Sequence, residues 1–452
     1  MIKTVHITNY YHANSGGVST SYNKLLEAAG REKRFVRLIV PGESEGVEDV
    51  NPFARIYFIK AGFSRVFDKR YRVMWPWNSY IFDRSPIKTI LRDEAPDLIE
   101  VGEKYTLSLM AGLIRKAIMN VSAPRPALVH LSCERMDDNV SSFISDNRFS
   151  RSFAKAYIRN YILPMFDFHL ANSAYTASEL LDAGEGAGNA FRSLCWRLLR
   201  SPEIPIADRV FVNECGVDHE TFSSFRKSPE VRSSMLARYG LPANAKVLLY
   251  AGRLSPEKNV DILPDIMRTL ASAKNNDYRL LVAGDGPLKT SLGDRFAKFC
   301  GTSVVMLGNI SDRAQLADIY ANCDAFIHPN PREPFGIAPL EAMSAGLPVV
   351  APNSGGLLSY ANDSNAWLVQ PTAVEFAAAI RDIIENPVAA ASRANMAIAT
   401  SERYTWERST TNLFALYDRL HADFINRRPL YDHLQPSTSP VMVNTNSTHG
   451  RS

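Results

Sequence analysis

The chain alternates between short apolar runs and helical stretches along most of its length, and this alternation constrains the fold more than any other feature. Each run is rich in aliphatic residues and is followed by a Gly, Pro or Asn break. Runs that are apolar almost throughout are typical of strands buried on both faces, and helices between them indicate parallel βαβ units. The expected strands are residues 4–8, 35–40, 97–101, 127–131, 168–172 and 210–213 in the first half, and 246–252, 279–284, 304–308, 324–329 and 348–352 in the second.

The two sets of runs predict two doubly wound, Rossmann-like domains of the α/β class that face each other across a cleft. A length of 452 residues allows two or three domains. We expect an N-terminal, acceptor-side domain at 1–215 and a C-terminal domain at 216–400 that binds a nucleotide. The apolar spacing of 404–425 predicts a helix that packs back onto the first domain. The polar, broken segment 428–452 is typical of a disordered tail.

Composition and charge exclude several classes of protein. The 51 Lys and Arg against 47 Asp and Glu give a net charge of +4, which lacks the basic excess typical of nucleic-acid binding. The five cysteines form no CxxC pair, which indicates reduced thiols rather than a disulfide framework or a zinc site. The N-terminus has no apolar signal segment, and no run approaches the ~20 apolar residues of a membrane-spanning helix. We expect a cytoplasmic protein.

Residues 53–84 mix aromatic and basic side chains, which leaves two interpretations open. Such a segment could rest at a membrane interface or shape a pocket for an acceptor. It is more often an aromatic elaboration that the N-terminal domain covers. Peripheral contact with a membrane is therefore one possible property of this chain.

The segment PREPFGIAPLE, residues 331–341, combines a loop with the start of a helix. Gly336 allows the backbone to approach a ligand closely. The helix is expected to begin just after it, with Pro339 in the first turn, where a missing N–H costs nothing. The amides of Phe335, Gly336 and Ile337 would then point outward from a helix N-terminus, which is a ready site for an anion.

Two glutamates flank this loop, and each has two interpretations. Glu341 could bind a ligand, or it could only complement the positive end of the helix dipole. Glu333 could contact the same ligand or be an exposed loop carboxylate. Their spacing alone does not make them the acid pair of a glycosidase, because that pair needs a defined gap across a sugar.

Other candidates follow other predicted strands. Arg253 and Lys258 in AGRLSPEKN could hold a diphosphate, although surface cations are more often only solvated. Gly16 and Gly17 could approach a ligand or form a flexible turn. His130 ends a strand and could be a ligand contact or a hydrogen-bonded core residue. Neither GxGxxG nor GxxxxGK[ST] occurs, which argues against an NAD-dependent dehydrogenase.

Taken together, these segments resemble the retaining glycosyltransferases of the GT-B type, family 4, over roughly residues 1–425. EPFGIAPLE resembles the E-x7-E element of that family, and AGRLSPEKN resembles its GRL-x3-K-N element. ANSAYTASEL (171–180) and CGVDHETF (215–222) are similar to segments around the domain crossover. In one departure, Cys215 stands where the family usually has Asn.

The resemblance implies a role for each matching residue. Arg253 and Lys258 would neutralise the leaving diphosphate, and His130 would contact a hydroxyl of the transferred sugar. Glu333 and the loop amides would hold the donor sugar, while Glu341 would accept hydrogen bonds from the ribose. The two glycines would approach the donor phosphate from across the cleft.

The expected function is a retaining transfer of a hexose from a nucleotide-diphosphate sugar to a hydroxyl of a glycan or lipid. Overall likeness to mannosyl-transferring members favours GDP-mannose over a UDP-hexose. No D-x-D pair is present, so we expect transfer without a metal and without a cofactor beyond the donor. The alternatives are a non-catalytic protein that binds sugar nucleotides and a nucleotide-sugar epimerase on the same scaffold.

Overall fold

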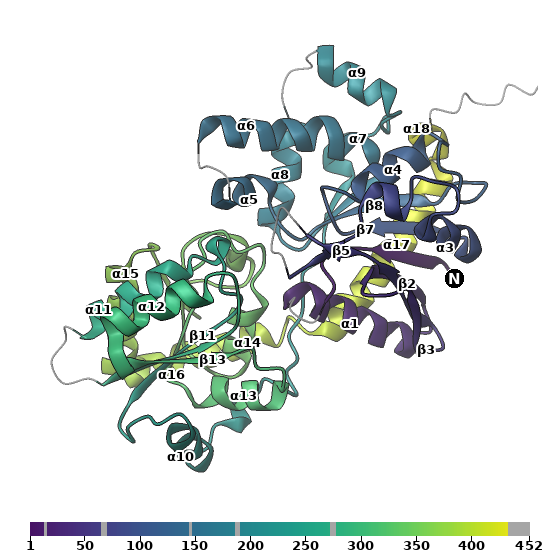
Figure 1. Ribbon diagram of the computed structural model, residues 1–452. Coiled ribbons are helices and arrows are strands. Elements are labelled where there is room, and N and C mark those ends of the chain that lie inside the picture. Colours follow the sequence, from purple (N-terminus) through teal and green to yellow (C-terminus); the bar gives the residue numbers. More distant parts are fainter. Residues whose placement is uncertain (13–15, 65–69, 144–146, 186–189, 272–276, 433–452) are drawn as a thin grey trace, which may run out of the picture.

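The chain forms two α/β domains, each built on a largely parallel sheet, and Figure 1 shows them side by side. The computed structural model describes residues 1–452 except 13–15, 65–69, 144–146, 186–189, 272–276 and 433–452. The α/β class and the pair of doubly wound domains that the sequence predicts are confirmed.

The first sheet, within the described residues, has eight strands in the order β10-β9-β8-β7-β1-β2-β4-β3. Its central strand β1 (Lys3–Ile7) pairs in parallel with β2 (Phe35–Gly42) on one side and β7 (Leu98–Val101) on the other. The chain therefore winds outward in both directions from β1, which is the doubly wound arrangement. The parallel strands beyond β7 are β8 (Ala127–Ser132), β9 (Phe168–Ala171) and β10 (Val210–Val212).

Two strands of this sheet were not predicted. β4 (Ala54–Lys60) pairs in parallel with β2, and β3 (Gly46–Asn51) pairs antiparallel with β4 at the edge. β4 lies inside the aromatic and basic segment, where the charged side chains of Arg55 and Lys60 obscured the strand pattern. That segment continues through the short strands β5 (Gly62–Phe63) and β6 (Arg72–Val73) into helix α2 (Pro76–Ser79).

The second sheet is fully parallel, in the order β13-β12-β11-β14-β15-β16. This order, in which the winding reverses beside the first strand, places a crevice next to the central strand β11 (Lys246–Ala251). The short edge strand β16 (Trp367–Val369) was not predicted. The remaining strands are β12 (Tyr278–Ala283), β13 (Val304–Gly308), β14 (Ala325–Ile327) and β15 (Val349–Pro352).

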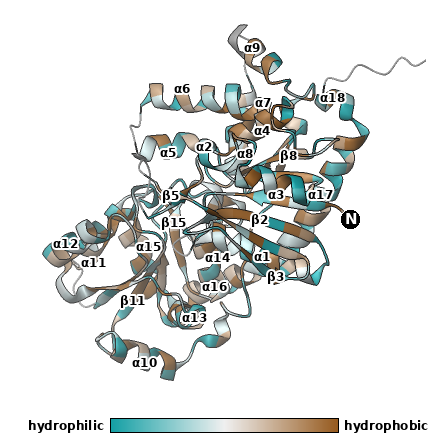
Figure 2. Cartoon of the chain, turned by 45° about the vertical axis from the view of Figure 1, so that its right-hand side comes forward, coloured by the Kyte–Doolittle hydropathy of each residue, from teal (hydrophilic) through white to brown (hydrophobic). Residues whose placement is uncertain are grey.

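Helices cover both faces of each sheet. In Figure 2, strand β2 is coloured as hydrophobic along most of its length, whereas α12 on the outside carries many hydrophilic residues. The helices of the first half are α1 (Gly17–Arg31), α3 (Pro86–Glu94), α4 (Ser108–Arg115), α5 (Met136–Phe143), α6 (Arg148–Tyr157), α7 (Leu163–Met165), α8 (Ala174–Gly184) and α9 (Ala190–Leu198). Those of the second half are α10 (Pro229–Arg238), α11 (Leu263–Ala271), α12 (Lys289–Cys300), α13 (Arg313–Asn322), α14 (Ile337–Ser344), α15 (Ala373–Glu385) and α16 (Pro387–Ser401). None of the helices in the described ranges is long and apolar enough to cross a membrane.

The last long helix, α17 (Trp406–Asn426), returns to the first domain, as the yellow ribbon of Figure 1 shows. Its buried residues Phe414, Tyr417 and Leu420 share a hydrophobic core with α1 and with strands of the first sheet. The Tyr417 hydroxyl donates a hydrogen bond to the buried carboxylate of Glu100 on β7.

The expected disordered tail is wrong at its start. Residues Arg428–Asp432 form the short helix α18, and Tyr431 is fully buried. The ring of Tyr431 packs beside Phe168 and Phe424, which gives this polar segment an apolar anchor. The rest of the predicted tail, 433–452, lies outside the described residues.

The chain crosses between the domains twice, and the two crossings lie side by side. Val217 forms a parallel bridge with Thr405, and its amide donates to the Tyr404 carbonyl at 2.8 Å. A Cβ at Gly216 would lie 2.3 Å from the backbone nitrogen of Trp406. A glycine is therefore required for this close approach.

Candidate active site between the two domains

A cavity of about 640 Å³ lies between the domains, at the carboxyl ends of the central strands. Its walls include Tyr10 after β1, Glu134 after β8 and Arg253 after β11. Parallel sheets bind ligands at this edge, and a cavity of this size is in the range of small-molecule sites.

Nine of the ten residues predicted from the sequence line this one cavity. Seven come from the C-terminal domain and two from the start of α1 in the N-terminal domain. They are Gly16, Gly17, Arg253, Lys258, Glu333, Phe335, Gly336, Ile337 and Glu341. The structure brings them together, while the role of each stays a prediction.

His130 is the exception, and the expected contact with a transferred sugar does not fit the structure. Its side chain is fully buried, lies against Phe166 and His169, and is not among the residues that line the cavity. Burial lowers the pKa of His130 well below its usual value, so the ring is neutral at pH 7. The side chain projects into the core from within β8 rather than from the end of the strand, which explains the correction.

Glu333 holds a buried carboxylate beside the predicted diphosphate cation. Its oxygens accept hydrogen bonds from Lys258 Nζ at 2.8 and 3.1 Å and from Asn330 Nδ2 at 2.9 Å. Burial opposes ionisation, but the Lys258 ammonium and the neighbouring His328 outweigh it and hold the pKa of Glu333 well below its usual range. Glu333 therefore stays ionised and fixes the Lys258 ammonium at the cavity wall.

Gly336 sets the geometry of the loop that leads into α14. Its φ of +92° lies in the left-handed region that favours glycine. A Cβ there would also lie 2.8 Å from the Tyr360 hydroxyl, which donates to the Gly336 carbonyl. This turn starts α14 at Ile337, so the first residues of the helix, whose amides have no acceptor within it, line the cavity, where an anion can accept from such amides.

Glu341 lies on α14, deeper in the same wall. Arg313 Nη2 is 3.4 Å from its Oε1, and the Tyr320 hydroxyl is 3.5 Å from its Oε2. Burial raises the pKa of Glu341 to about 7, although Arg313 acts in the opposite direction. The carboxyl group thus changes charge near neutral pH, unlike that of Glu333.

The two domains touch at the rim of the cavity. Arg70 pairs with Asp285 at 3.1 Å, and the Ser173 hydroxyl donates to the Pro334 carbonyl. The Arg253 guanidinium lies 4.7 Å from the ring centroid of Tyr71, on the N-terminal domain. One predicted diphosphate cation is therefore already in contact with the opposite wall.

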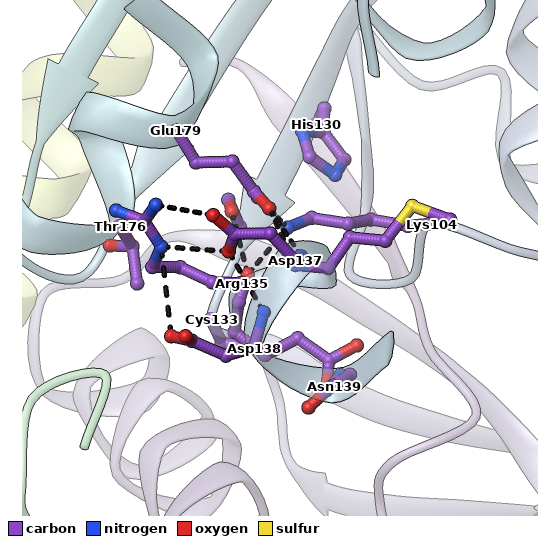
Figure 3. A network of polar contacts seen from close by, with 12 residues as sticks. Lys104, His130, Cys133, Arg135, Asp137, Asp138, Asn139, Thr176 and Glu179 are labelled. Atoms are coloured by element: carbon purple, nitrogen blue, oxygen red, sulfur yellow. Dashed lines mark hydrogen bonds and ion pairs between the residues drawn. The ribbon is translucent and has the colours of Figure 1, made fainter. Parts of the chain in front are cut away.

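Sequence reasoning missed the polar residues of the N-terminal wall. Cavity-lining residues of this kind are Tyr10, Glu103, Tyr105, Glu134, Arg135, Asp138 and Asn139. The available signal was the run CERMDD, which directly follows a predicted strand at the edge where ligands bind. Behind this run lies the network of Lys104, Arg135, Asp137 and Glu179 that Figure 3 shows.

Comparisons with known proteins agree with this geometry. Residues 232–403 match the family described as glycosyl transferases group 1. A GDP-mannose-dependent alpha-(1-6)-phosphatidylinositol dimannoside mannosyltransferase of Mycobacterium tuberculosis is 26% identical over 422 residues, which are 92% of this chain and 95% of the relative. A D-inositol 3-phosphate glycosyltransferase of Mycolicibacterium smegmatis is 33% identical over 49% of this chain and 50% of the relative.

Solved structures show the same fold at low sequence identity. Sucrose-phosphate synthase from Thermosynechococcus elongatus superposes with a TM-score of 0.70 at 19% identity, covering 93% of this chain and 99% of that one. Anabaena HepE in complex with UDP and glucose gives 0.65 at 18% identity, with 93% and 100% covered. The chain therefore has the GT-B fold, and its C-terminal domain matches the group 1 glycosyl transferases.

Proposed function

We propose that the protein transfers mannose from GDP-mannose to a hydroxyl of a glycan or lipid, with retention of anomeric configuration and without a metal. The observation that carries this proposal is the C-terminal wall of the cavity, where Arg253, Lys258 and the N-terminus of α14 line one space. Two fixed cations and helix amides can stabilise the negative charge that develops on a departing diphosphate.

The role that we propose for each residue follows from its contacts. Arg253 offers a planar fork of donors to the diphosphate, and Lys258 adds a point charge. Glu333 holds Lys258 in place and keeps an ionised carboxylate near the sugar of the donor. Glu341, when ionised, can accept hydrogen bonds from the ribose hydroxyls. The acceptor approaches from the N-terminal wall.

The donor assignment rests on the mannosyltransferase relative, whose printed name includes GDP-mannose and which matches 92% of this chain. A UDP-hexose is the second candidate. The test is calorimetric titration with GDP and, separately, UDP in the presence of EDTA. Binding of GDP alone is the expected result. Binding of UDP alone would change the assigned donor from GDP-mannose to a UDP-hexose. Binding of neither by folded protein would overturn the nucleotide site.

Contact with an anionic membrane surface would supply a lipid acceptor. The aromatic side chains of Phe63, Trp77 and Phe82 are more than half exposed. Trp77 and Phe82 share a shallow groove with three basic residues and two acidic ones, Lys60, Arg72, Arg84, Glu43 and Glu45. Aromatic and basic side chains together favour the interface of an anionic bilayer.

Co-sedimentation with vesicles tests this part of the proposal. Wild-type protein should pellet with vesicles that contain phosphatidylglycerol and remain in solution with pure phosphatidylcholine. Trp77→Ser combined with Phe82→Ser should release it, while Phe225→Ser, at an even more exposed position on the other domain, should not. Equal pelleting of all three proteins would refute the assignment of this surface.

A further inference from the structure

A carboxylate enters the cavity from the wall opposite the donor residues. Glu134 follows β8, lines the cavity, and its Oε1 accepts a hydrogen bond from the Tyr10 hydroxyl at 2.7 Å. Its second oxygen has no hydrogen-bond partner among the described residues. A carboxylate oxygen accepts hydrogen bonds, so this oxygen is available to a hydroxyl of a ligand.

A buried ion pair holds the backbone that carries Glu134. Lys104 Nζ donates to Glu179 Oε2 at 2.7 Å and also to the carbonyl oxygen of Glu134. The other oxygen of Glu179 accepts from the amides of Met136 at 2.6 Å and Asp137 at 3.0 Å. The turn between β8 and α5 is therefore fixed at the carbonyl of Glu134 and at the two amides of Met136 and Asp137 that follow it.

This ion pair is costly, because Lys104 is 1% exposed and Glu179 is 6% exposed. Removing two charges from water costs several kcal/mol for each ion, and such pairs contribute little net stability. The hydrogen bonds of this pair directly support another role, which is to fix the position of the turn. Figure 3 shows Lys104 and Glu179 on one side of this turn.

The N-terminal wall also shapes which ligand fits beside Glu134. Glu103 and Asp138 line the same wall, and the fork of Arg135 is held by Asp137, with Nε to Oδ1 at 3.0 Å and Nη2 to Oδ2 at 2.6 Å. Burial raises the pKa of Glu103 to about 7 and that of Asp138 to about 6. Both carboxyl groups can hydrogen-bond hydroxyls in either protonation state, and above neutral pH both repel a phosphate, which is a form of selection against the wrong ligand. The aromatic rings of Tyr10 and Tyr105 add apolar surface to this wall.

We propose that Glu134 binds the reacting end of the acceptor, that this end is an uncharged polyol such as a glycosyl residue, and that Lys104 and Glu179 are positioning residues for Glu134. This inference rests on the proposed glycosyl transfer and specifies its acceptor. A phosphate next to the reacting hydroxyl is unfavourable in this wall, whereas a charged group farther along the acceptor is not restricted.

The first experiment compares acceptors and Glu134 variants. Wild-type protein saturated with GDP should show binding of methyl α-mannoside by saturation-transfer NMR, and weaker binding of mannose 6-phosphate. Steady-state kinetics with GDP-mannose and methyl α-mannoside should give an acceptor KM that is about 10-fold or more higher in Glu134→Gln, the scale of losing a hydrogen bond to a charged group. The GDP Kd should change less than twofold, and the exposed control Glu27→Gln should match the wild type.

Each other outcome overturns part of the inference. An unchanged acceptor KM, or an equal loss of GDP affinity, removes Glu134 from the acceptor site. Preference for mannose 6-phosphate, or no binding of methyl α-mannoside to the GDP complex, refutes the uncharged polyol. Failure of the wild type to bind GDP or UDP is a different result, because it contradicts the proposed function itself.

The positioning residues are tested by removing both charges together. The double variant Lys104→Met, Glu179→Gln leaves no unpaired buried charge and should raise the acceptor KM while the GDP Kd is kept. Adding Glu134→Gln to it should cause little further loss, because residues that act through one another are not additive. Fully additive losses, or an unchanged acceptor KM in a folded double variant, would leave the ion pair without a positioning role.

Discussion

Nucleotide affinity should depend on pH near neutrality, because of Glu341. The free protein holds the pKa of this carboxyl at about 7 through burial. Ribose hydroxyls donate hydrogen bonds to the ionised carboxylate, so nucleotide binding requires the proton to leave. The sign follows from this requirement: affinity rises as pH increases through 7 and falls below it.

The magnitude follows from the fraction of ionised carboxylate. If only the ionised form binds, the apparent Kd is multiplied by 1 + 10^(pKa − pH), which gives a factor of about 2 at pH 7 and about 11 at pH 6. The difference between pH 8 and pH 6 is thus about tenfold, or about 1.4 kcal/mol. Arg313 and Asp218 also face Glu341, and they act in opposite directions on its pKa, which Arg313 lowers and Asp218 raises.

The assay is calorimetric titration of GDP at pH 6, 7 and 8 in buffers of different ionisation enthalpy, which also counts the protons released. Glu341→Gln is the matched control, because it removes the titration of Glu341 and leaves in place the titrations of the ligand phosphate and of Glu103 and Asp138, whose pKa values burial raises. The wild type should lose about tenfold more affinity than the variant between pH 8 and pH 6. Parallel pH profiles for the two proteins would show that Glu341 only complements the helix dipole.

Three further predictions concern residues already described. Arg253→Ala or Lys258→Ala should lower turnover about 100-fold, the scale of one charge-stabilising group in a transition state, and near-normal kcat in both would remove the diphosphate clamp. Gly17→Ala should weaken donor binding and hinder contact between the domains, because the new Cβ lies 3.2 Å from Ile337 Cδ1. Gly16→Ala meets no protein atom within 4 Å and should weaken donor binding alone, so titration with nucleotide and thermal melting distinguish the two variants. Tyr431→Ala should lower the free energy of unfolding by about 3–5 kcal/mol. If the variant unfolds in urea with the same free energy as the wild type, α18 does not contribute to the core.

The sequence predicted the long buried strands and failed where a strand is short or partly exposed. Strands such as β11 are apolar on both faces, so periodicity alone locates them. β4 presents Arg55 and Lys60 beside buried Ile56 and Ile59, and its identity depends on its partner β2. α18 was missed because a single aromatic residue anchors it among polar neighbours.

The candidate site was also predicted only in part, because its C-terminal wall was found from the sequence and its N-terminal wall was missed. The C-terminal wall is formed by continuous segments, such as residues 331–341, whose local pattern already indicates a loop followed by a helix N-terminus. The N-terminal wall is assembled from side chains far apart in sequence, and the pairing of Lys104 with Glu179 is visible only in three dimensions. His130 was misassigned because a strand sequence does not show which of its last residues faces the core.

The return of α17 to the first domain has a consequence for biosynthesis. The core beneath the first sheet includes Phe414 and Tyr431, so the domain that leaves the ribosome first lacks part of its core until almost the whole chain has been made. At about 5–20 residues per second, the last 200 residues take roughly 10–40 seconds to synthesise. During that time the carboxylate of Glu100 lacks the hydroxyl of Tyr417, and the face that α17 will cover is open to chaperones. The domain translated second can therefore finish folding before the first.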